Sequence, residues 1–262
     1  MSDVQIVFDI GGTNSRVAVV RAGVLGSPAI FPTAQDPEEG LRNVCESAQA
    51  LAGDDAIREV CGCVAGTVMQ GVVVGANNLL LWNGFPLVQK CSEALGTIPV
   101  TIFNDAELAG MGEFFYGAGT GYKRILYVTV STGVGMARIV DGRITHEKDP
   151  LIIGEELISL LDLEHRVSGT AVKNTYGIDP KDLTDQAIRE GLADCLASGL
   201  KNSVSAFRPD ALVLGGSMIT GQNSIPLDRI QRQISVPIKK ATLGDVGGLW
   251  GAVAYLNQKG TP

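Results

Sequence analysis

The stretch Asp9-Ile10-Gly11-Gly12-Thr13-Asn14 joins two apolar segments, residues 4–10 and 15–20, that are rich in β-branched residues. β-Branched residues favour strands, and glycine and asparagine in a short connection favour a tight turn. The sequence therefore predicts a β-hairpin over residues 4–20, with turn residues at positive φ. Its glycines would let backbone N–H groups approach a phosphate closely.

A second hairpin with the same kind of turn is predicted further along the chain. Residues 125–130 form an apolar strand, the turn Ser131-Thr132-Gly133-Val134-Gly135 follows, and residues 136–140 form the next strand. The repeated order is a duplication of architecture rather than of residue identity. It predicts two similar α/β units that meet at a short connection near Asn104.

Further elements are predicted from the spacing of apolar residues. Residues 37–51 have helical periodicity, and residues 68–74 and 211–214 are typical strands. Residues 181–207 are predicted to form one long helix, and residues 249–256 a closing helix.

The two glycine turns are candidate phosphate-binding sites. Gly11, Gly12 and Gly133 can present backbone N–H groups, and Thr13 and Thr132 can add hydroxyl groups. An ordinary glycine-rich hairpin is the alternative for either turn alone. The occurrence of both turns at matching places in two similar units favours phosphate binding.

Two carboxylates stand at predicted strand ends. Asp9 precedes the first turn, where a carboxylate would repel phosphate unless a cation lay between them, so Asp9 indicates Mg²⁺, bound directly or through water. Asp105 follows the strand that ends at Phe103-Asn104 and precedes a helix. It can be a plain N-cap, or a general base that accepts a hydroxyl proton.

A glycine pair, Gly215-Gly216, follows the buried strand at residues 211–214. Glycines at the carboxyl end of a strand allow a flat ring to approach the backbone, and ligands of α/β sheets bind at such ends. A simple strand-to-helix turn explains the pair equally well.

The composition excludes several classes of protein. The net charge of −7 and a pI of about 4.9 argue against a nucleic-acid-binding face. No run of 18 apolar residues occurs and the first residues do not resemble a signal peptide, so we expect no membrane span and a cytoplasmic location. The five cysteines do not suggest a disulfide framework, and Cys61 and Cys63 are expected in the core.

Taken together and in this order, the motifs resemble those of the ROK family (repressors, open reading frames and kinases) in the actin/hexokinase/Hsp70 superfamily. The resemblance covers nearly the whole chain. Residues 9–13 resemble the first phosphate motif and residues 131–135 the second, with Ser131 where glycine is more usual. Residues 213–217 resemble the adenosine motif.

Two more segments resemble the sugar side of that family. Asn78-Leu79, followed by Trp82 and Gly84-Phe85-Pro86-Leu87, resembles its Asn-Leu…Trp…Pro-Leu segment. Asn104-Asp105 resembles the sugar-contacting asparagine and the catalytic aspartate. The resemblance thus implies that Asp105 is the base and that Asn78 and Asn104 hold the sugar.

The resemblance implies two RNase H-like lobes with mixed sheets flanked by helices, and a cleft between them that binds sugar and ATP. The lobes would be residues 1–104 with the C-terminal helix 246–259, and residues 105–245. The implied reaction is Mg²⁺-dependent transfer of the γ-phosphoryl group of ATP to a hexose or N-acetylhexosamine hydroxyl, commonly O6. The family also suggests a homodimer.

The chain departs from the family pattern on the sugar side. Gly154-Glu155 is kept, but Ile158 stands where the family has a histidine. No cysteine lies between Cys91 and Cys195, so the family's zinc loop is absent and no structural zinc is expected. Leu163-Glu164 still resembles the end of that loop, so the resemblance implies that Glu164 binds sugar, as it does for Glu155 of the kept Gly-Glu pair. Without the histidine and the zinc loop, the identity of the sugar stays open.

Two other functions are compatible with the same motifs. A non-catalytic sugar-binding regulator is one, although the repressors of the family carry an N-terminal DNA-binding domain for which there is no space before residue 9. The retained Asp105 also favours an enzyme. A kinase for a non-sugar alcohol is the other, and the segment from Asn78 to Trp82 disfavours it.

Overall fold

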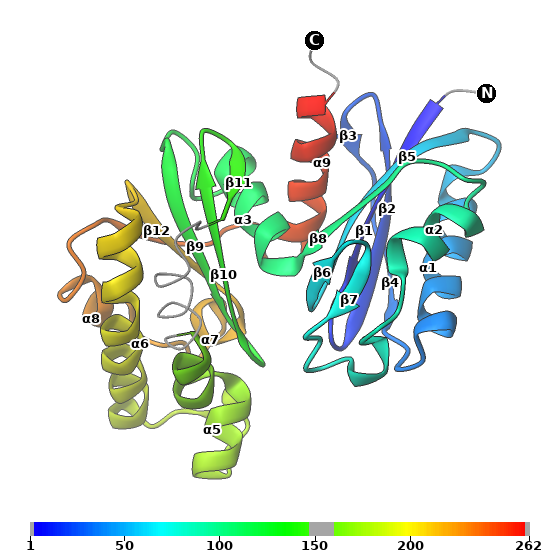
Figure 1. The fold of residues 1–262 in the computed structure, drawn as a ribbon. Coiled ribbons are helices and arrows are strands. Elements are labelled where there is room, and N and C mark those ends of the chain that lie inside the picture. Colours follow the sequence, from blue (N-terminus) through cyan, green and yellow to red (C-terminus); the bar gives the residue numbers. More distant parts are fainter. Residues whose placement is uncertain (1–2, 147–159, 260–262) are drawn as a thin grey trace. The chain divides into compact units, whose positions relative to one another are not determined.

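The computed structural model describes residues 3–146 and 160–259. The chain divides into two compact units: unit 1 is Met1–Gly112 with Val246–Pro262, and unit 2 is Glu113–Asp245. Figure 1 shows the elements of each unit. The boundary predicted at Asn104 falls inside unit 1, where β8 (Val100–Asn104) meets α3 (Asp105–Tyr116).

Unit 1 contains one mixed sheet whose strand order is β3-β2-β1-β5-β8, with β4 also paired to β2. The central β1 is antiparallel to β2 and parallel to β5, and β5 is parallel to β8. The hairpin predicted over residues 4–20 is therefore confirmed. The bounds are β1 (Asp3–Ile10), β2 (Asn14–Arg21), β3 (Val24–Leu25), β4 (Ala29–Pro32) and β5 (Ala56–Val64).

Helices cover both faces of this sheet, because side chains alternate between the faces of a strand. Ile6 and Phe8 of β1 pack in the cluster that includes α1 (Pro37–Ala52) and α2 (Leu87–Ala94), whereas Val7 packs with α9 (Gly247–Lys259). α1 begins at the Asp36 cap, whose Oδ1 accepts the Glu39 N–H at 2.8 Å.

The single strand predicted over residues 68–74 is wrong. Those residues form a separate hairpin of β6 (Thr67–Met69) and β7 (Val72–Val74). Gln70 and Gly71 have φ values of 51° and 83°. Two adjacent residues at positive φ make the tight turn that reverses the chain within the valine-rich run.

Unit 2 repeats the sheet arrangement of unit 1, with the order β11-β10-β9-β12-β13. β10 is antiparallel to β9 and β11, while β12 is parallel to β9 and β13. The internal duplication and the predicted α/β class with mixed sheets flanked by helices are confirmed. The bounds are β9 (Arg124–Val130), β10 (Val134–Val140), β11 (Arg143–Thr145), β12 (Ala211–Gly215) and β13 (Ile238–Lys240).

The core of unit 2 lies between one sheet face and the helices. Leu126 and Val128 of β9 pack with Leu196 and Leu200 of α6. α6 begins at residue 186, later than predicted, because Asp185 caps it by accepting the Ile188 N–H at 3.1 Å. The helices are α5 (Gly169–Tyr176), α6 (Gln186–Phe207), α7 (Ser217–Thr220) and α8 (Leu227–Gln231), and residues 160–167 are also helical.

Short 3₁₀ turns complete the two units. They are η1 (Leu80–Trp82), η2 (Pro180–Asp182) and η3 (Gly244–Val246). None of the helices within residues 3–146 and 160–259 combines the length and the apolar character needed to cross a membrane.

Candidate active site

The carboxyl ends of three parallel strands bring together three predicted site residues of unit 1: the metal candidate Asp9, the sugar candidate Asn104 and the catalytic candidate Asp105. In the register of the sheet, Asp9 of β1 pairs with Cys63 of β5, and the next residue of β5, Val64, pairs with Asn104 of β8. Asp105 follows at the first position of α3. Ligands of α/β sheets bind at such strand ends, so these residues form a candidate site.

Asp105 has an environment suited to proton transfer. Its side chain is half-buried. Burial, together with the negative charge of Asp9, raises the pKa of Asp105 to about 7 against opposing hydrogen bonds from backbone N–H groups and Asn104. A carboxyl group with this pKa can accept a proton near neutral pH.

A buried thiol and a helix start complete the surroundings of Asp9. Burial first, and then the charges of Asp9 and Asp105, hold the pKa of the Cys63 thiol well above its usual value. A Cβ added at Gly248, in the first turn of α9, would lie 3.1 Å from Asp9 Oδ2. The positive end of the α9 dipole therefore faces this carboxylate. The sequence reasoning missed this contact, for which the Gly247-Gly248 pair was the available signal.

The pKa of Asp105 predicts a pH dependence. If its carboxylate is the base, kcat/KM falls about tenfold per pH unit below about pH 7 and levels off above it. The measurement is kcat/KM for the sugar between about pH 5 and 9, with thermal unfolding recorded at each pH to exclude acid denaturation. A profile that stays flat down to the usual pKa of an aspartate, about 4, would contradict the assignment.

Asn104 caps α3. Its Oδ1 accepts the N–H of Ala106, the second residue of the helix, at 2.9 Å, and Glu107 Oε2 reaches back to accept the Asn104 N–H at 3.2 Å. Its Nδ2 also donates to the carbonyl of Gly66 at 3.2 Å. Asp105 Oδ1 accepts the same Ala106 N–H at 2.9 Å, but Asn104 and Glu107 already form the cap, so capping alone does not explain Asp105.

The first glycine turn differs from its predicted geometry. Residues 11–14 all lie in the described part of the chain, and none of them has a positive φ, so that expectation is wrong. Glycine is needed at these positions because a Cβ atom would collide with neighbouring atoms. A Cβ at Gly11 would lie 2.9 Å from the Asn14 carbonyl oxygen, and a Cβ at Gly12 would lie 2.9 Å from Asn78 Cβ.

Neighbouring strands fix the shape of this turn. The Gly11 N–H donates to the Asn14 carbonyl at 3.1 Å, and Thr33 Oγ1 donates to the Gly11 carbonyl at 2.8 Å. The Thr33 N–H donates to the Thr13 carbonyl at 2.9 Å. The Gly11 N–H is thus used inside the turn. Thr13, whose carbonyl accepts one of these bonds, is exposed on the surface of unit 1.

The segment around Asn78 divides into an exposed and a buried part. Asn78 is exposed beside Gly12, so the structure brings a predicted sugar residue to the first turn. Trp82 is fully buried, and its Nε1 donates to the Ala34 carbonyl at 3.1 Å. It packs on Gly40 of α1, which identifies Trp82 as a core residue of unit 1.

The second glycine turn, in unit 2, is held by the start of α5. The Ser131 N–H donates to the Gly133 carbonyl at 2.8 Å, and the Gly169 N–H donates to the Ser131 carbonyl at 2.6 Å. Thr170 Oγ1 donates to the Thr132 carbonyl at 2.8 Å. These bonds fix the backbone around Thr132 and Gly133 without using the Thr132 hydroxyl as a donor.

Glu164 lies at this turn. Its Oε2 accepts the Val134 N–H at 3.0 Å, and a Cβ added at Gly133 would lie 2.7 Å from the same oxygen. The structure therefore joins a residue predicted to bind sugar with one predicted to bind phosphate. The other predicted acidic residue, Glu155, lies outside the described residues.

The glycine pair after β12 lies close to the same turn. Gly215 is buried, and a Cβ there would lie 2.7 Å from the Tyr127 hydroxyl. Gly216 has φ 84° and ψ 161° and begins α7, and a Cβ there would lie 2.3 Å from the Val130 carbonyl oxygen. Val130 directly precedes Ser131, so Gly216 packs against the strand end that carries the second turn.

Comparison with known sequences identifies the family. A sequence model of the ROK family matches residues 5–148, which include both glycine turns and Asp105. The chain belongs to the ROK family. The family prediction made from the motifs is confirmed.

Members of the ROK family resemble this chain over most of its length. A glucokinase of Streptomyces coelicolor is 26% identical, with 95% of this chain and 90% of the relative covered. The structure of a ROK hexokinase from Thermus thermophilus has a TM-score of 0.80 and 26% identity and covers 98% of this chain and 99% of its own. That of an inorganic polyphosphate/ATP-glucomannokinase from Arthrobacter has a TM-score of 0.76 and 26% identity, covering 98% and 100%.

Asp9 and Asp105 are the candidate metal ligands of this ROK protein. Within residues 3–146 and 160–259, no group of three or more histidine, cysteine, aspartate or glutamate side chains is arranged to hold a metal ion by itself. Mg²⁺ is commonly held by one or two carboxylates together with phosphate oxygens of a substrate. Asp9 and Asp105 offer two such carboxylates.

Proposed function

We propose that this ROK-family sugar kinase transfers the γ-phosphoryl group of ATP to a hydroxyl group of a hexose or N-acetylhexosamine, with O6 as the acceptor. The enzyme class is supported by relatives that this chain matches over most of their length and that are named glucokinase, hexokinase and glucomannokinase. The observation that carries the proposal is Asp105, a half-buried carboxyl group with a pKa of about 7 beside Asp9.

Asp105 acts as the general base in this proposal. A sugar hydroxyl within hydrogen-bond reach of its carboxylate gives up its proton as the sugar oxygen bonds to the γ-phosphorus and the bond from that phosphorus to the leaving ADP breaks. Such a group contributes roughly 10²–10⁴-fold to the rate. The capping bonds that Asn104 forms with Ala106 and Glu107 fix the backbone before Asp105 and so orient its carboxylate.

Asp9 is proposed to hold Mg²⁺ directly or through a water molecule. The repulsion between Asp9 and Asp105, which contributes to the raised pKa of Asp105, is relieved by a cation at this place. When bound, Mg²⁺ would neutralise charge on the phosphate oxygens of ATP. The Cys63 thiol, fully buried beside both carboxylates, keeps water away from their inner side.

Apart from Gly11, the remaining predicted residues keep the roles that the family resemblance gives them. Phosphate binding is proposed for Gly12 and Thr13 in unit 1 and for Thr132 and Gly133 in unit 2. Gly11 supports the first turn, since its N–H is bonded to Asn14. Gly215 and Gly216 are proposed to lie at the adenosine, on the support that Gly216 packs against the strand end before the second turn.

Sugar binding is proposed for Asn78, Asn104, Glu155 and Glu164. Asn78 and Asn104 have supporting positions in unit 1, near the first turn and Asp105 respectively. Glu164 accepts the Val134 N–H with Oε2 and has Oε1 as a second acceptor for a sugar hydroxyl. We further propose a cytoplasmic homodimer, as the family resemblance implies.

An ADP-release assay with a panel of sugars tests the function. Glucose, fructose, mannose, N-acetylmannosamine and N-acetylglucosamine are offered with ATP and Mg²⁺, and the phosphorylated position is read by ³¹P NMR. At least one sugar is expected to raise ADP release above the sugar-free rate and to yield the 6-phosphate. Asp54→Asn, at an exposed position of unit 1, is the charge-matched control for Asp105→Asn in the same assay.

Two results would contradict the proposal. Absence of ADP release with every sugar, combined with tight sugar binding by calorimetry, would indicate the non-catalytic regulator instead. A product phosphorylated at another hydroxyl group would keep the kinase but refute the O6 assignment.

A further inference from the structure

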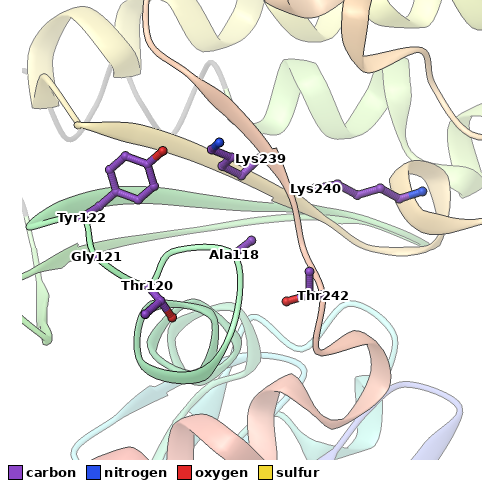
Figure 2. Close-up of a pocket in the computed structure, with 7 residues that line it drawn as sticks. All are labelled: Ala118, Thr120, Gly121, Tyr122, Lys239, Lys240 and Thr242. Carbon is purple, nitrogen blue, oxygen red and sulfur yellow. The ribbon is translucent and has the colours of Figure 1, made fainter.

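A cavity in unit 2 is lined by none of the residues assigned above. It is a depression that opens to solvent, with a volume of about 470 Å³, and it is bordered by the loop that follows α3 and by β13 with the residues after it. Figure 2 shows the residues that line it. Ligand cavities have volumes of roughly 300–1,000 Å³, so the space suffices for a small molecule.

The walls of this cavity are fixed by a buried carboxylate. Glu113 is 2% exposed, and its carboxylate accepts the Ala118 N–H at 2.7 Å from one wall. It accepts the Thr242 N–H and the Leu243 N–H, both at 2.8 Å, from the other wall. Both walls are thus tied to one group, and little ordering entropy remains to be lost when a ligand binds.

The lining carries positive charge and hydroxyl groups. Lys239 and Lys240 are exposed, and neither forms an ion pair with any residue in the described part of the chain. Figure 2 shows Tyr122 and Lys239 extending on the same side of the cavity, with Lys240 pointing away from them. No carboxylate belongs to the lining, and Glu113 is buried behind it.

This combination selects a class of ligand. An ammonium group binds a phosphate dianion through charge-assisted hydrogen bonds. Tyr122 lines the same cavity as Lys239, so its hydroxyl can donate to an anion bound there, and its ring offers an apolar face. We propose that this cavity is a second anion site of the protein, which binds a small phosphate-bearing molecule at Lys239 and Tyr122. The inference does not depend on the proposed reaction.

Calorimetric titration of the full chain tests the site. Inorganic phosphate and glucose 6-phosphate are titrated separately into the wild type, Lys239→Gln and the control Lys173→Gln. Lys173 is exposed in the last turn of α5 and does not line the cavity, so both changes remove one surface charge from unit 2. Circular dichroism confirms that each variant is folded.

Lys239→Gln is expected to weaken binding of the ligand about tenfold, the value of one charge-assisted hydrogen bond, while Lys173→Gln leaves it unchanged. A preference for glucose 6-phosphate that Lys239→Gln abolishes would assign the site to a sugar phosphate, and equal binding of the two ligands, weakened alike by Lys239→Gln, would assign it to free phosphate. The proposal is overturned if neither ligand binds the wild type, or if Lys239→Gln binds both as the wild type does.

Discussion

Asp105→Asn is expected to lower kcat by about 10²–10⁴-fold and, at the same time, to stabilise the protein at neutral pH. The first effect follows from loss of the base, because an amide cannot accept the hydroxyl proton. Asparagine keeps the side-chain oxygen that accepts the Ala106 N–H, so the start of α3 is preserved. The proton-transfer function is thus removed with little change of shape.

The stabilisation follows from the direction of the pKa shift. The pKa of Asp105 is about 7 in the folded chain, against 3.8 for the ordinary side chain. Between these values the carboxyl group ionises readily only in the unfolded chain, which favours unfolding. The penalty therefore grows as the pH rises from about 4 to 7 and is constant above that. One pKa unit corresponds to about 1.4 kcal/mol. After a discount for the half-exposed side chain, we expect Asp105→Asn to raise the free energy of unfolding at neutral pH by about 1–3 kcal/mol.

Both effects are measured on the same preparations. Steady-state kinetics gives kcat, and denaturant unfolding at about pH 5 and 8 gives the two free energies, with Asp54→Asn as the control. The gain in stability should be larger at the higher pH. Turnover within about threefold of the wild type would exclude Asp105 as the base, since a lost base costs far more. A loss of stability at pH 8 would contradict the electrostatic account.

The sequence was sufficient for those parts of the site that depend on local pattern. β-Branched runs on either side of Gly11-Gly12 define a hairpin wherever they occur, and the same pattern at Ser131 predicts its duplicate. Asp9, Asn104 and Asp105 were each predicted at the end of a strand, and the structure shows that they meet because the carboxyl ends of parallel strands share one edge of the sheet.

The remaining features depend on contacts between distant residues. Nothing near Gly12 in the sequence indicates that Asn78 lies against it. The pattern therefore predicts a glycine with positive φ, whereas the structure requires glycine because a Cβ would collide with Asn78. Glu164 lies thirty positions beyond Val134, and its bond to that N–H depends on how residues 160–167 pack. The turn at Gln70-Gly71 could not be predicted, because the apolar residues on both sides of it read as one continuous strand.

Gly216→Ala is expected to destabilise unit 2 by about 3 kcal/mol or more and to weaken nucleotide binding at least about tenfold. Two causes add. The backbone at φ 84° and ψ 161° lies in a region that is essentially restricted to glycine. The new Cβ would also lie 2.3 Å from the Val130 carbonyl oxygen, which is backbone and cannot rotate away.

The functional effect follows from where that strain must be released. Val130 is the last residue of β9, and Ser131 begins the turn that carries Thr132 and Gly133. Displacement of the Val130 carbonyl therefore moves the proposed phosphate-binding backbone directly. Thermal unfolding reports the stability, and titration with a non-hydrolysable ATP analogue reports the affinity.

Two other glycines of unit 2 separate the causes. Gly177 has φ 68° and ψ 12°, and a Cβ there meets no atom within 4 Å, so Gly177→Ala carries backbone strain alone and costs about 1 kcal/mol. Gly191 lies exposed within α6 with the same open space, and Gly191→Ala gains up to about 1 kcal/mol from helix propensity. Neither change should alter nucleotide affinity. If Gly216→Ala behaved like Gly177→Ala in both measurements, contact with the Val130 carbonyl would have no role in holding the second turn.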